Sequence, residues 1–228
     1  MRRLGSLSFA LLLMAMAPAG YSQAPDHAAY VLTYIDVLSE AAPQVRDLLV
    51  RYLHTSAGIK GRLGAAALEE IGRPERFALL ELWDSEADGR AQRASAAMVA
   101  MAQQLAGFSA GYEDRRFFEA RPVTEGAAPD FAAPVQSIAH LDLIGPLPSE
   151  AGQFINDLPA QLHLLPGNLG AALLPQLGRG NHLSLWVQWH DQSSWRAALG
   201  SALSRRMRST LGPHLGSPYD ERVYQMLH

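Results

Sequence analysis

The sequence predicts an α+β fold: two ferredoxin-like domains, each β-α-β-β-α-β, that form an intramolecular pseudo-dimeric α/β barrel. Three observations predict it. A long segment occurs twice in the chain, each copy shows the same succession of strand and helix patterns, and a Pro/Ala/Gly-rich stretch separates the copies. Both faces of the predicted strands are rich in apolar residues, as expected if two sheets pack face to face.

The repeat is the primary observation. The segment from Gly61 to Trp83 reads GRLGAAALEEIGRPERFALLELW, and the segment from Gly167 to Trp189 reads GNLGAALLPQLGRGNHLSLWVQW. The offset is 106 residues without a gap, and 10 of the 23 pairs are identical, where average composition gives roughly two by chance. Two copies are too few for a solenoid, so the chain is a duplicated small domain.

The first strand of each copy carries a polar face. Residues 30–37, YVLTYIDV, alternate and are rich in β-branched and aromatic side chains, which is typical of a strand. The 106-residue offset makes Tyr34 equivalent to His140 and Asp36 equivalent to Asp142 on this face. A helix is predicted over 39–53. Its counterpart begins at Ser149 and should kink or end early at Pro159.

The repeated segment itself predicts a β-hairpin. Strands are expected over 63–71 and 76–83, around turn residues at 72–75, and the same pattern surrounds 178–181. Ser85 and Asp191 are N-cap residue types, and a long helix is predicted after each.

The closing strands are predicted over 112–118 and 219–224. Their best sequence match has an offset of 107, which predicts a one-residue insertion before the second of them.

The predicted organisation is a signal peptide over 1–24, a first domain over 28–120, a linker over 121–134 and a second domain over 135–228. Two arginines precede the apolar run from Leu4 to Ala17, and cleavage is expected near Ala19 or Ala24. The apolar run is short for a membrane span, so the mature protein is predicted to be periplasmic or secreted, without a stable span. An uncleaved N-terminal anchor is the alternative.

The composition excludes several classes of function. The net charge of -3 and the absence of a Lys/Arg block argue against nucleic-acid binding. The chain has no cysteine, which excludes disulfides, thiolate metal sites and cysteine nucleophiles. The histidines form no HxH or HExxH pattern, and no dinucleotide or phosphate loop is present. Residues 205–208, RRMR, are interpreted as a solvated helix face.

The chain resembles the antibiotic biosynthesis monooxygenase (ABM) superfamily, a dimeric α/β-barrel group that includes quinol monooxygenase-like proteins. The resemblance rests on the opening strand YVLTYIDV, the Gly-x-Leu-Gly start at Gly61, the strand end Glu81-Leu82-Trp83, and the closing GYEDR and PYDER segments. It implies this fold and chemistry that ranges from cofactor-free oxygenation to haem degradation. Many relatives have a histidine where this chain has Gln92 and Ala198, and Val187 replaces Glu81 in the second copy, which argues against haem degradation.

The polar and aromatic residues of the predicted strands and helix ends supply the candidate site. The catalytic candidates are Trp83, Tyr34, His140 and Trp189. The substrate-binding candidates are Asp36, His54, Asn168 and Trp186. Each has a structural alternative: the tryptophans as core residues, His140 as a satisfied histidine at the interdomain face, and Asp36 as a turn cap or ion-pair partner.

Two functions follow from these residues. The first is a cofactor-independent monooxygenase acting on a quinol-like or anthrone-like aromatic small molecule, with no bound cofactor or metal. The second is a catalytically degenerate periplasmic protein that binds an apolar small molecule between sheet and helices. The predicted pseudo-dimer is intramolecular, and an exposed second-helix face would permit further homo-oligomers.

Overall fold

The computed structural model describes residues 27–111, 113–120 and 130–228. The predicted signal peptide over 1–24 lies outside the described residues, as does 121–129 of the predicted linker, so the expected segment boundaries stay predictions. In the described part of the chain, no helix is long and apolar enough to cross a membrane.

The first half contains four strands and three α-helices in the predicted order. They are β1 (Ala29–Asp36), α1 (Ala42–Thr55), β2 (Arg62–Glu70), β3 (Arg76–Trp83), α2 (Glu86–Ala91), α3 (Ala96–Ala106) and β4 (Asp114–Glu119).

The second half repeats this order. Its elements are β5 (Val135–Asp142), α4 (Ser149–His163), β6 (Asn168–Pro175), β7 (His182–Trp189), α5 (Gln192–Leu199), α6 (Ala202–Leu211) and β8 (Asp220–Met226). Each half is therefore the predicted β-α-β-β-α-β unit.

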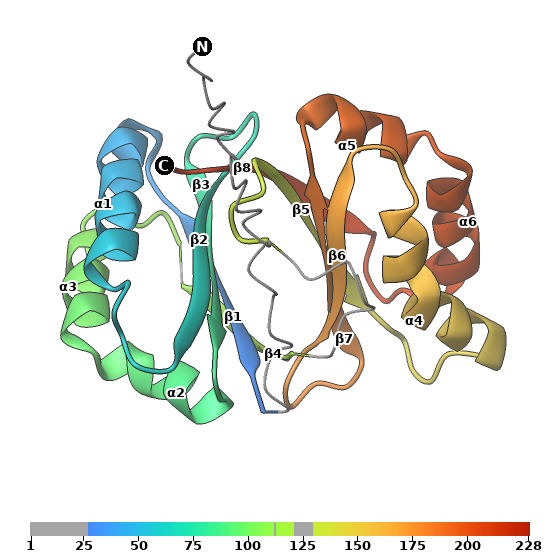
Figure 1. Ribbon diagram of the computed structural model, residues 1–228, viewed down its shortest axis with the longest axis horizontal. Helices are drawn as coiled ribbons and strands as arrows, with labels where there is room; N and C mark the ends of the chain where they lie inside the picture. The colour runs from blue at the N-terminus through green and yellow to red at the C-terminus, as the bar shows by residue number, and fades with distance from the viewer. Residues whose placement is uncertain (1–26, 112, 121–129) are drawn as a thin grey trace, which may run out of the picture.

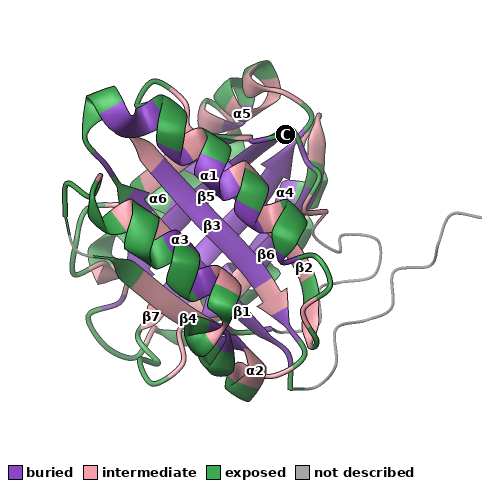
Figure 2. Cartoon of the chain, turned by 90° about the vertical axis from the view of Figure 1, so that its left-hand side faces the viewer, coloured by how far each residue is buried: buried purple, intermediate pink, exposed green. Residues whose placement is uncertain are grey.

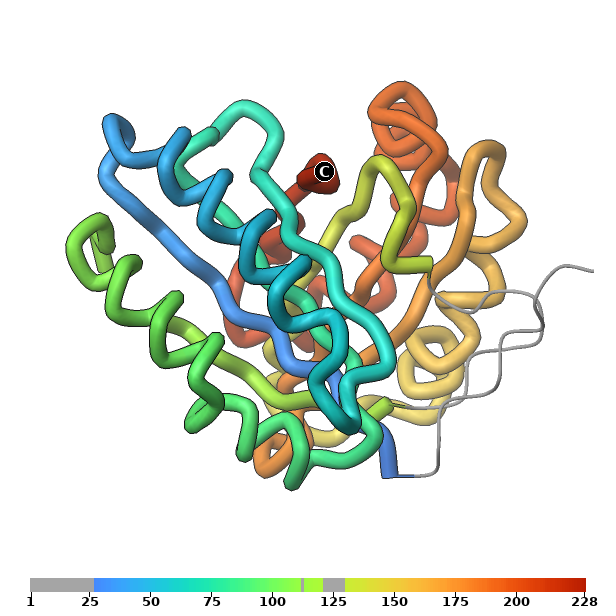
Figure 3. The backbone as a smooth tube through the Cα atoms, turned by 60° about the vertical axis from the view of Figure 1, so that its left-hand side comes forward, coloured from blue at the N-terminus to red at the C-terminus, as the bar shows by residue number. Residues whose placement is uncertain are grey.

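The eight strands form one sheet in the order β4-β1-β3-β2-β8-β5-β7-β6. The halves join where β2 pairs with β8, and the two ends of the sheet approach where Phe118 bridges Gln176. The result is a nearly closed barrel with the helices outside it, one set on each side (Figure 1). Figure 3 shows the two halves side by side, each with its helices on the outer surface. The predicted pseudo-dimeric barrel is confirmed.

Strand alternation divides the apolar side chains into three clusters. One fills the barrel interior and includes Tyr30, Leu32, Trp186 and Tyr224. The other two lie between the sheet and the helices, one in each half. Figure 2 shows the buried strand β3 crossing beneath α1 and α3, whose outer faces are exposed. The three cavities that bear on function lie at a barrel end and between the sheet and the helices.

The predicted one-residue insertion before the last strand is wrong. Tyr34 pairs with Asp114, and its equivalent His140 pairs with Asp220, so the offset is still 106 in the closing strands. The register shifts at residues 62/64 and 168/170 are also 106 apart. The strand pairing therefore makes Arg116 the equivalent of Arg222, a correspondence that comparison of the two sequence copies did not give.

Two helix predictions also need correction. The long helix predicted after Ser85 and Asp191 is broken in both halves, because Ser95 and Ser201 each cap a new helix with their side chains. The first cap accepts from the Met98 N–H and thereby satisfies a free N–H at the helix start. The helix α4 does not end at Pro159 but continues to His163.

Candidate functional site

A polar cluster lies beneath the helices of the first half. The Tyr52 hydroxyl of α1 donates to Oε1 of Glu81 on β3 at 2.9 Å, and Gln92 Nε2 donates to the Tyr52 oxygen at 2.7 Å. Tyr52, Glu81 and Gln92 are all buried, and Glu81 is 0% exposed. A carboxyl group in such a place requires several partners to offset its desolvation.

Arg62 approaches the same carboxyl group from the start of β2. Its Nη1 lies 3.6 Å from Glu81 Oε1 and donates to Ser56 Oγ at 2.7 Å. Ser56 in turn donates to the Tyr52 carbonyl at the end of α1. The cluster therefore connects the end of α1, β2, β3 and the segment after α2.

Several polar atoms in this region have no hydrogen-bond partner among the described residues. They are Thr33 Oγ1, Glu81 Oε2, Trp83 Nε1, Gln92 Oε1, and Nε and Nη1 of Arg115. Buried polar groups are nearly always paired, so a group of unpaired atoms in one place indicates a functional site or an ordered water.

The second half replaces five residues of the cluster with apolar ones. At the 106-residue offset, the pairs are Thr33/Ala139, Tyr52/Leu158, Ser56/Leu162, Glu81/Val187 and Gln92/Ala198. All five second-half residues belong to the helix-side core. The fold therefore forms without the cluster, and its presence in the first half calls for a functional explanation.

Burial determines the acid–base character of the cluster. Desolvation raises the pKa of Glu81, while the Tyr52 hydrogen bond and the Arg115 and Arg62 charges lower it to a smaller extent. Desolvation also raises the pKa of Tyr52, and the neighbouring Glu81 raises it further. Glu81 is thus a stronger base than an ordinary carboxylate, and Tyr52 remains a proton donor.

A cavity of about 200 Å³ lies next to this cluster, between β1 and α3. Its lining is largely apolar and includes Ile35, Met98, Met101 and Leu105. Thr33 connects cavity and cluster, because it lines the cavity and its unpaired hydroxyl is buried. Glu81 pairs with Val31 in the β1–β3 register, so Thr33 and Glu81 are diagonal neighbours on the same face. We call this the first-half cavity.

Three of the predicted site residues meet at one end of the barrel, and two of them, Tyr34 and Asp36, also line the first-half cavity. Tyr34, Asp36 and His140 line a cavity of about 530 Å³ together with Arg116 and Arg222. The two guanidinium carbons lie 5.3 and 5.2 Å from the Tyr34 ring centroid. Burial raises the pKa of Tyr34 to about 12, so its phenol stays protonated at neutral pH.

His140 is fully engaged in a hydrogen-bond chain across this barrel end. Arg116 Nη1 lies 3.1 Å from His140 Nδ1, and His140 Nε2 lies 3.2 Å from His182 Nδ1. Since a guanidinium can only donate, His140 accepts at Nδ1 and donates from Nε2. His182 then presents its Nε2–H to Asp142 Oδ1 at 3.5 Å. Neither ring nitrogen of His140 is left for a substrate in this arrangement.

The two strand-end tryptophans occupy equivalent helix-side positions and differ in one hydrogen bond. Trp83 and Trp189 are 1% and 2% exposed. The Trp189 indole donates to Ser137 Oγ at 3.3 Å. The equivalent of Ser137 is Val31, and the Trp83 indole has no acceptor in the described chain. Trp83 therefore adds a free donor to the first-half cluster.

The other predicted residues do not join these sites. Trp186 lies in the barrel interior and donates to Gln136 Oε1 at 2.9 Å. His54 is exposed near the end of α1. Asn168 starts β6, where its Nδ2 reaches the Gly170 carbonyl at 3.5 Å. The eight predicted residues are thus divided among several parts of the molecule, and their roles stay predictions.

Sequence reasoning missed Tyr52, Thr33 and Arg115 as site residues, and treated Gln92 and Glu81 only as departures from a pattern. A signal was present. Thr33, Tyr52, Glu81 and Gln92 are polar residues at buried positions, and the residue 106 positions after each of them is apolar. Within the described ranges, no group of three or more His, Asp or Glu side chains is placed to hold a metal ion.

The fold and the helix-side cavity define a class of protein: a two-domain α/β barrel with room for a small molecule between sheet and helices. Residues 28–104 match the family model described as antibiotic biosynthesis monooxygenase. The protein is therefore a tandem barrel whose first half matches the ABM family model over these residues and whose second half repeats the same fold. A comparison with curated proteins found no match.

Solved structures share the whole two-domain architecture. A candidate monooxygenase from Fusobacterium nucleatum is 11% identical with a TM-score of 0.73, covering 89% of this chain and 93% of that one. A candidate monooxygenase from Lactobacillus acidophilus is 8% identical with a TM-score of 0.65, covering 89% and 95%. An anthrone oxidase-like protein is 13% identical with a TM-score of 0.66, covering 91% and 94%. At these identities the likeness establishes the fold.

Proposed function

We propose that the protein is a monooxygenase that oxidises a quinol-like or anthrone-like aromatic small molecule in the first-half cavity, without a bound cofactor. The ABM match of the first half supports the reaction class. The observation that carries the proposal is the buried polar cluster of the first half, which the second half replaces with Val187, Leu158 and Ala198.

The chemistry requires little from the protein. Glu81, with its raised pKa, accepts the proton of a phenol and leaves an electron-rich anion. That anion supplies the electrons to dioxygen. One oxygen atom bonds to a ring carbon and becomes a carbonyl oxygen of the quinone product. The other oxygen atom leaves as water. The cavity's apolar lining orients the flat ring and excludes water from the anion.

Arg115 and Trp83 are suited to stabilise the negative charge that develops during the reaction. Both have buried N–H groups without an acceptor among the described residues. Such donors cost stability unless an acceptor arrives, so an oxygen anion on the substrate would find them already in position. We assign them to charge stabilisation and Glu81 to proton transfer.

The test is oxygen uptake by the purified mature protein on a panel of quinols and anthrones. We expect uptake above the autoxidation rate, with one labelled atom from isotopic dioxygen in the product. Glu81→Gln keeps the size of the side chain but cannot accept the proton, and should lose activity about a hundredfold or more. Uptake that Glu81→Gln leaves unchanged would contradict the assignment.

The alternative function is a binding protein for an apolar small molecule. It is favoured by Gln92, which stands where many ABM relatives have a histidine and here bonds to Tyr52. Saturable binding of quinols or anthrones to the first-half cavity without oxygen uptake would support this alternative. It would also refute the monooxygenase.

We further propose that the protein is exported and acts in the periplasm or outside the cell, because of the charged and apolar N-terminal pattern. Mass spectrometry of the protein from the extracytoplasmic fraction should show a new N-terminus near residue 20 or 25. A full-length chain retained in the cytoplasm would contradict this. We propose that the substrate site is complete within one chain, so activity should not depend on further association between copies.

A further inference from the structure

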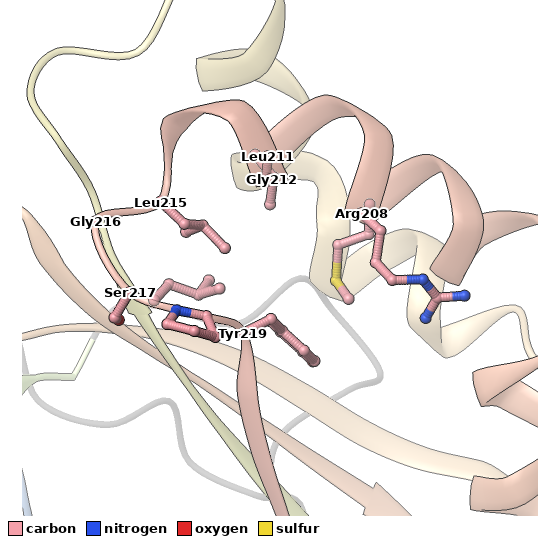
Figure 4. A pocket seen from close by; sticks show the side chains of 10 residues that line it. Arg208, Leu211, Gly212, Leu215, Gly216, Ser217 and Tyr219 are labelled. Carbon is pink, nitrogen blue, oxygen red and sulfur yellow. The ribbon is translucent and has the colours of Figure 1, made fainter.

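A second helix-side cavity lies between β5, α6 and the segment that leads into β8. It measures about 410 Å³, and Figure 4 shows it between the end of α6 and Tyr219. The side chains that line it are mostly apolar: Leu141, Met207, Leu211, Leu215 and Pro218. We call it the second-half cavity.

This cavity is the duplicate of the first-half cavity. Leu141, Met207 and Leu211 stand 106 residues after Ile35, Met101 and Leu105, which line the other one. The duplication has therefore kept a cavity in a half that lost the buried Glu81 cluster. A cavity kept without counterparts of Tyr52, Glu81 and Gln92 points to binding rather than reaction.

Two substitutions change the charge of the lining between the copies. Arg208 takes the place of Ala102, and Tyr219 takes the place of Glu113. The first-half cavity thus has two acidic residues in its wall, Asp36 and Glu113, whereas the second-half cavity has a guanidinium and a phenol. Gly212 also replaces Ala106, which removes a methyl group from the wall of the larger cavity.

Arg208 is free to bind an anion. It forms no ion pair with a carboxylate in the part of the chain that the structure describes, and its contact to the Leu199 carbonyl is long, at 3.4 Å. It lies close enough to Tyr219 for its charge to lower the pKa of that phenol, against the larger raising effect of burial. The other two arginines of α6 are engaged: Arg205 donates to the Gly200 carbonyl at 2.6 Å, and Arg206 covers the Phe154 ring at 4.9 Å.

The inner wall is held in place by a fixed network. The Tyr219 hydroxyl donates to Glu221 Oε2 at 3.3 Å, and the Trp195 indole donates to Glu221 Oε1 at 3.2 Å. The Glu221 carboxylate behind the cavity therefore already accepts hydrogen bonds from two side chains of the protein. The charge left for a ligand is that of Arg208, at the rim in Figure 4.

We propose that the second-half cavity is a binding site for an amphipathic organic anion, with its apolar body against Leu141, Met207 and Leu211 and its acidic group at Arg208. The cavity volume suits a molecule the size of a substituted naphthalene. This site is separate from the proposed reaction site and does not depend on it.

The test uses two fluorescent probes of one shape: anilinonaphthalene sulfonate, and its uncharged parent phenylnaphthylamine. The full chain should bind the sulfonate more tightly. Arg208→Gln should weaken sulfonate binding about fivefold to tenfold and leave the uncharged probe unaffected, because a rim guanidinium acts on charge alone. Arg205→Gln is the matched control and should change neither affinity.

Two filling variants locate the binding. Gly212→Leu should abolish binding of both probes; no atom lies within 4 Å of a Cβ added at Gly212, so the new side chain starts in open space. A thermal midpoint close to the parental one confirms that this variant is folded. Ala106→Leu places the same side chain at the equivalent position of the first-half cavity and should leave sulfonate binding intact. Equal affinity for the two probes, an equal effect of Arg205→Gln and Arg208→Gln, or binding that survives Gly212→Leu would each overturn the proposal.

Discussion

At the scale of single residues, the two halves act as controls for each other. The same fold holds Glu81 in one copy and Val187 in the other, so the energetic cost of the polar cluster is separable from the fold. A buried hydrogen-bonded cluster is stable as a whole, but losing one partner exposes the others to the full cost of desolvation.

Tyr52→Phe tests this at one atom. The change removes the hydroxyl that joins Glu81 and Gln92, and it should destabilise the protein by about 1–3 kcal/mol because two buried groups lose a partner. Urea unfolding at neutral pH measures it.

The set of substitutions that the second half already carries should behave differently. Tyr52→Leu, Glu81→Val and Gln92→Ala remove the three mutually hydrogen-bonded side chains together, and Arg62 keeps its bonds to Ser56 Oγ and the Leu53 carbonyl. The triple variant should therefore be at least as stable as Tyr52→Phe. A triple variant far less stable than the single one would show that the cluster holds the first half together.

His140 makes the stability of the folded protein depend on pH. Burial, Arg116 and His182 lower its pKa below the usual value of 6.5. As the pH falls, His140 is therefore protonated in the unfolded chain before it is protonated in the folded protein. The stabilisation that comes from neutral His140 is present above about pH 6.5 and is lost as the pH falls below that value. Protonation at Nδ1 would also remove the acceptor of Arg116.

The charged and titratable groups that face this histidine come from five strands: Tyr34 of β1, Asp114 and Arg116 of β4, Asp142 of β5, His182 of β7, and Asp220 and Arg222 of β8. We expect the thermal midpoint to drop more between pH 7.5 and pH 5.5 in the parent protein than in His140→Asn. Equal drops would assign the acid sensitivity to the carboxylates.

At the scale of elements, sequence patterns predicted whether a segment forms a strand or a helix better than they predicted the residue at which it ends. Alternation in YVLTYIDV and the repeated hairpin identified the strands, and both are in the structure. The breaks at Ser95 and Ser201 were missed because the apolar pattern continues across them, although serine is a preferred N-cap residue.

Ser201→Ala tests the second break. Ser201 Oγ accepts from the Ser204 N–H at 3.1 Å, and losing this cap should cost about 1 kcal/mol. Ser209→Ala, on the exposed side of the same helix, is the control and should cost less. Chemical unfolding compares the two. Equal effects would mean that α6 does not depend on its cap.

At the scale of the whole molecule, the sequence predicted that the two halves form one barrel, but it did not predict that β2 and β8 are the strands that join them. The candidate site was predicted in part: Trp83 belongs to the first-half cluster, and Tyr34 and Asp36 line the first-half cavity, whereas His140 lies at a barrel end. Face assignment along β1 follows from alternation, but which face meets the helices depends on how the two sheets close. That closure depends on contacts between residues far apart in the sequence, as does the hydrogen bond from Arg115 to the Gly89 carbonyl at 3.2 Å. Local sequence patterns do not predict such contacts.

The shared interior predicts cooperative unfolding. Trp186 of β7 packs against Tyr30 of β1, with ring centroids 5.7 Å apart. Trp186→Ala should cost about 3–5 kcal/mol and lower a single transition that circular dichroism and fluorescence report alike. Two separated transitions would mean that the halves fold independently.

The central claim is that the first half carries the reaction and the second does not. The most direct measurement is oxygen uptake with the best quinol or anthrone substrate, comparing the triple variant Tyr52→Leu, Glu81→Val, Gln92→Ala with the second-half variant Ser137→Val. Ser137→Val removes the Trp189 hydrogen bond and gives the second half the residue that the first half has. We predict that the triple variant falls to the autoxidation rate while Ser137→Val retains parental activity. Parental uptake by the triple variant, or its loss in Ser137→Val alone, would contradict the account.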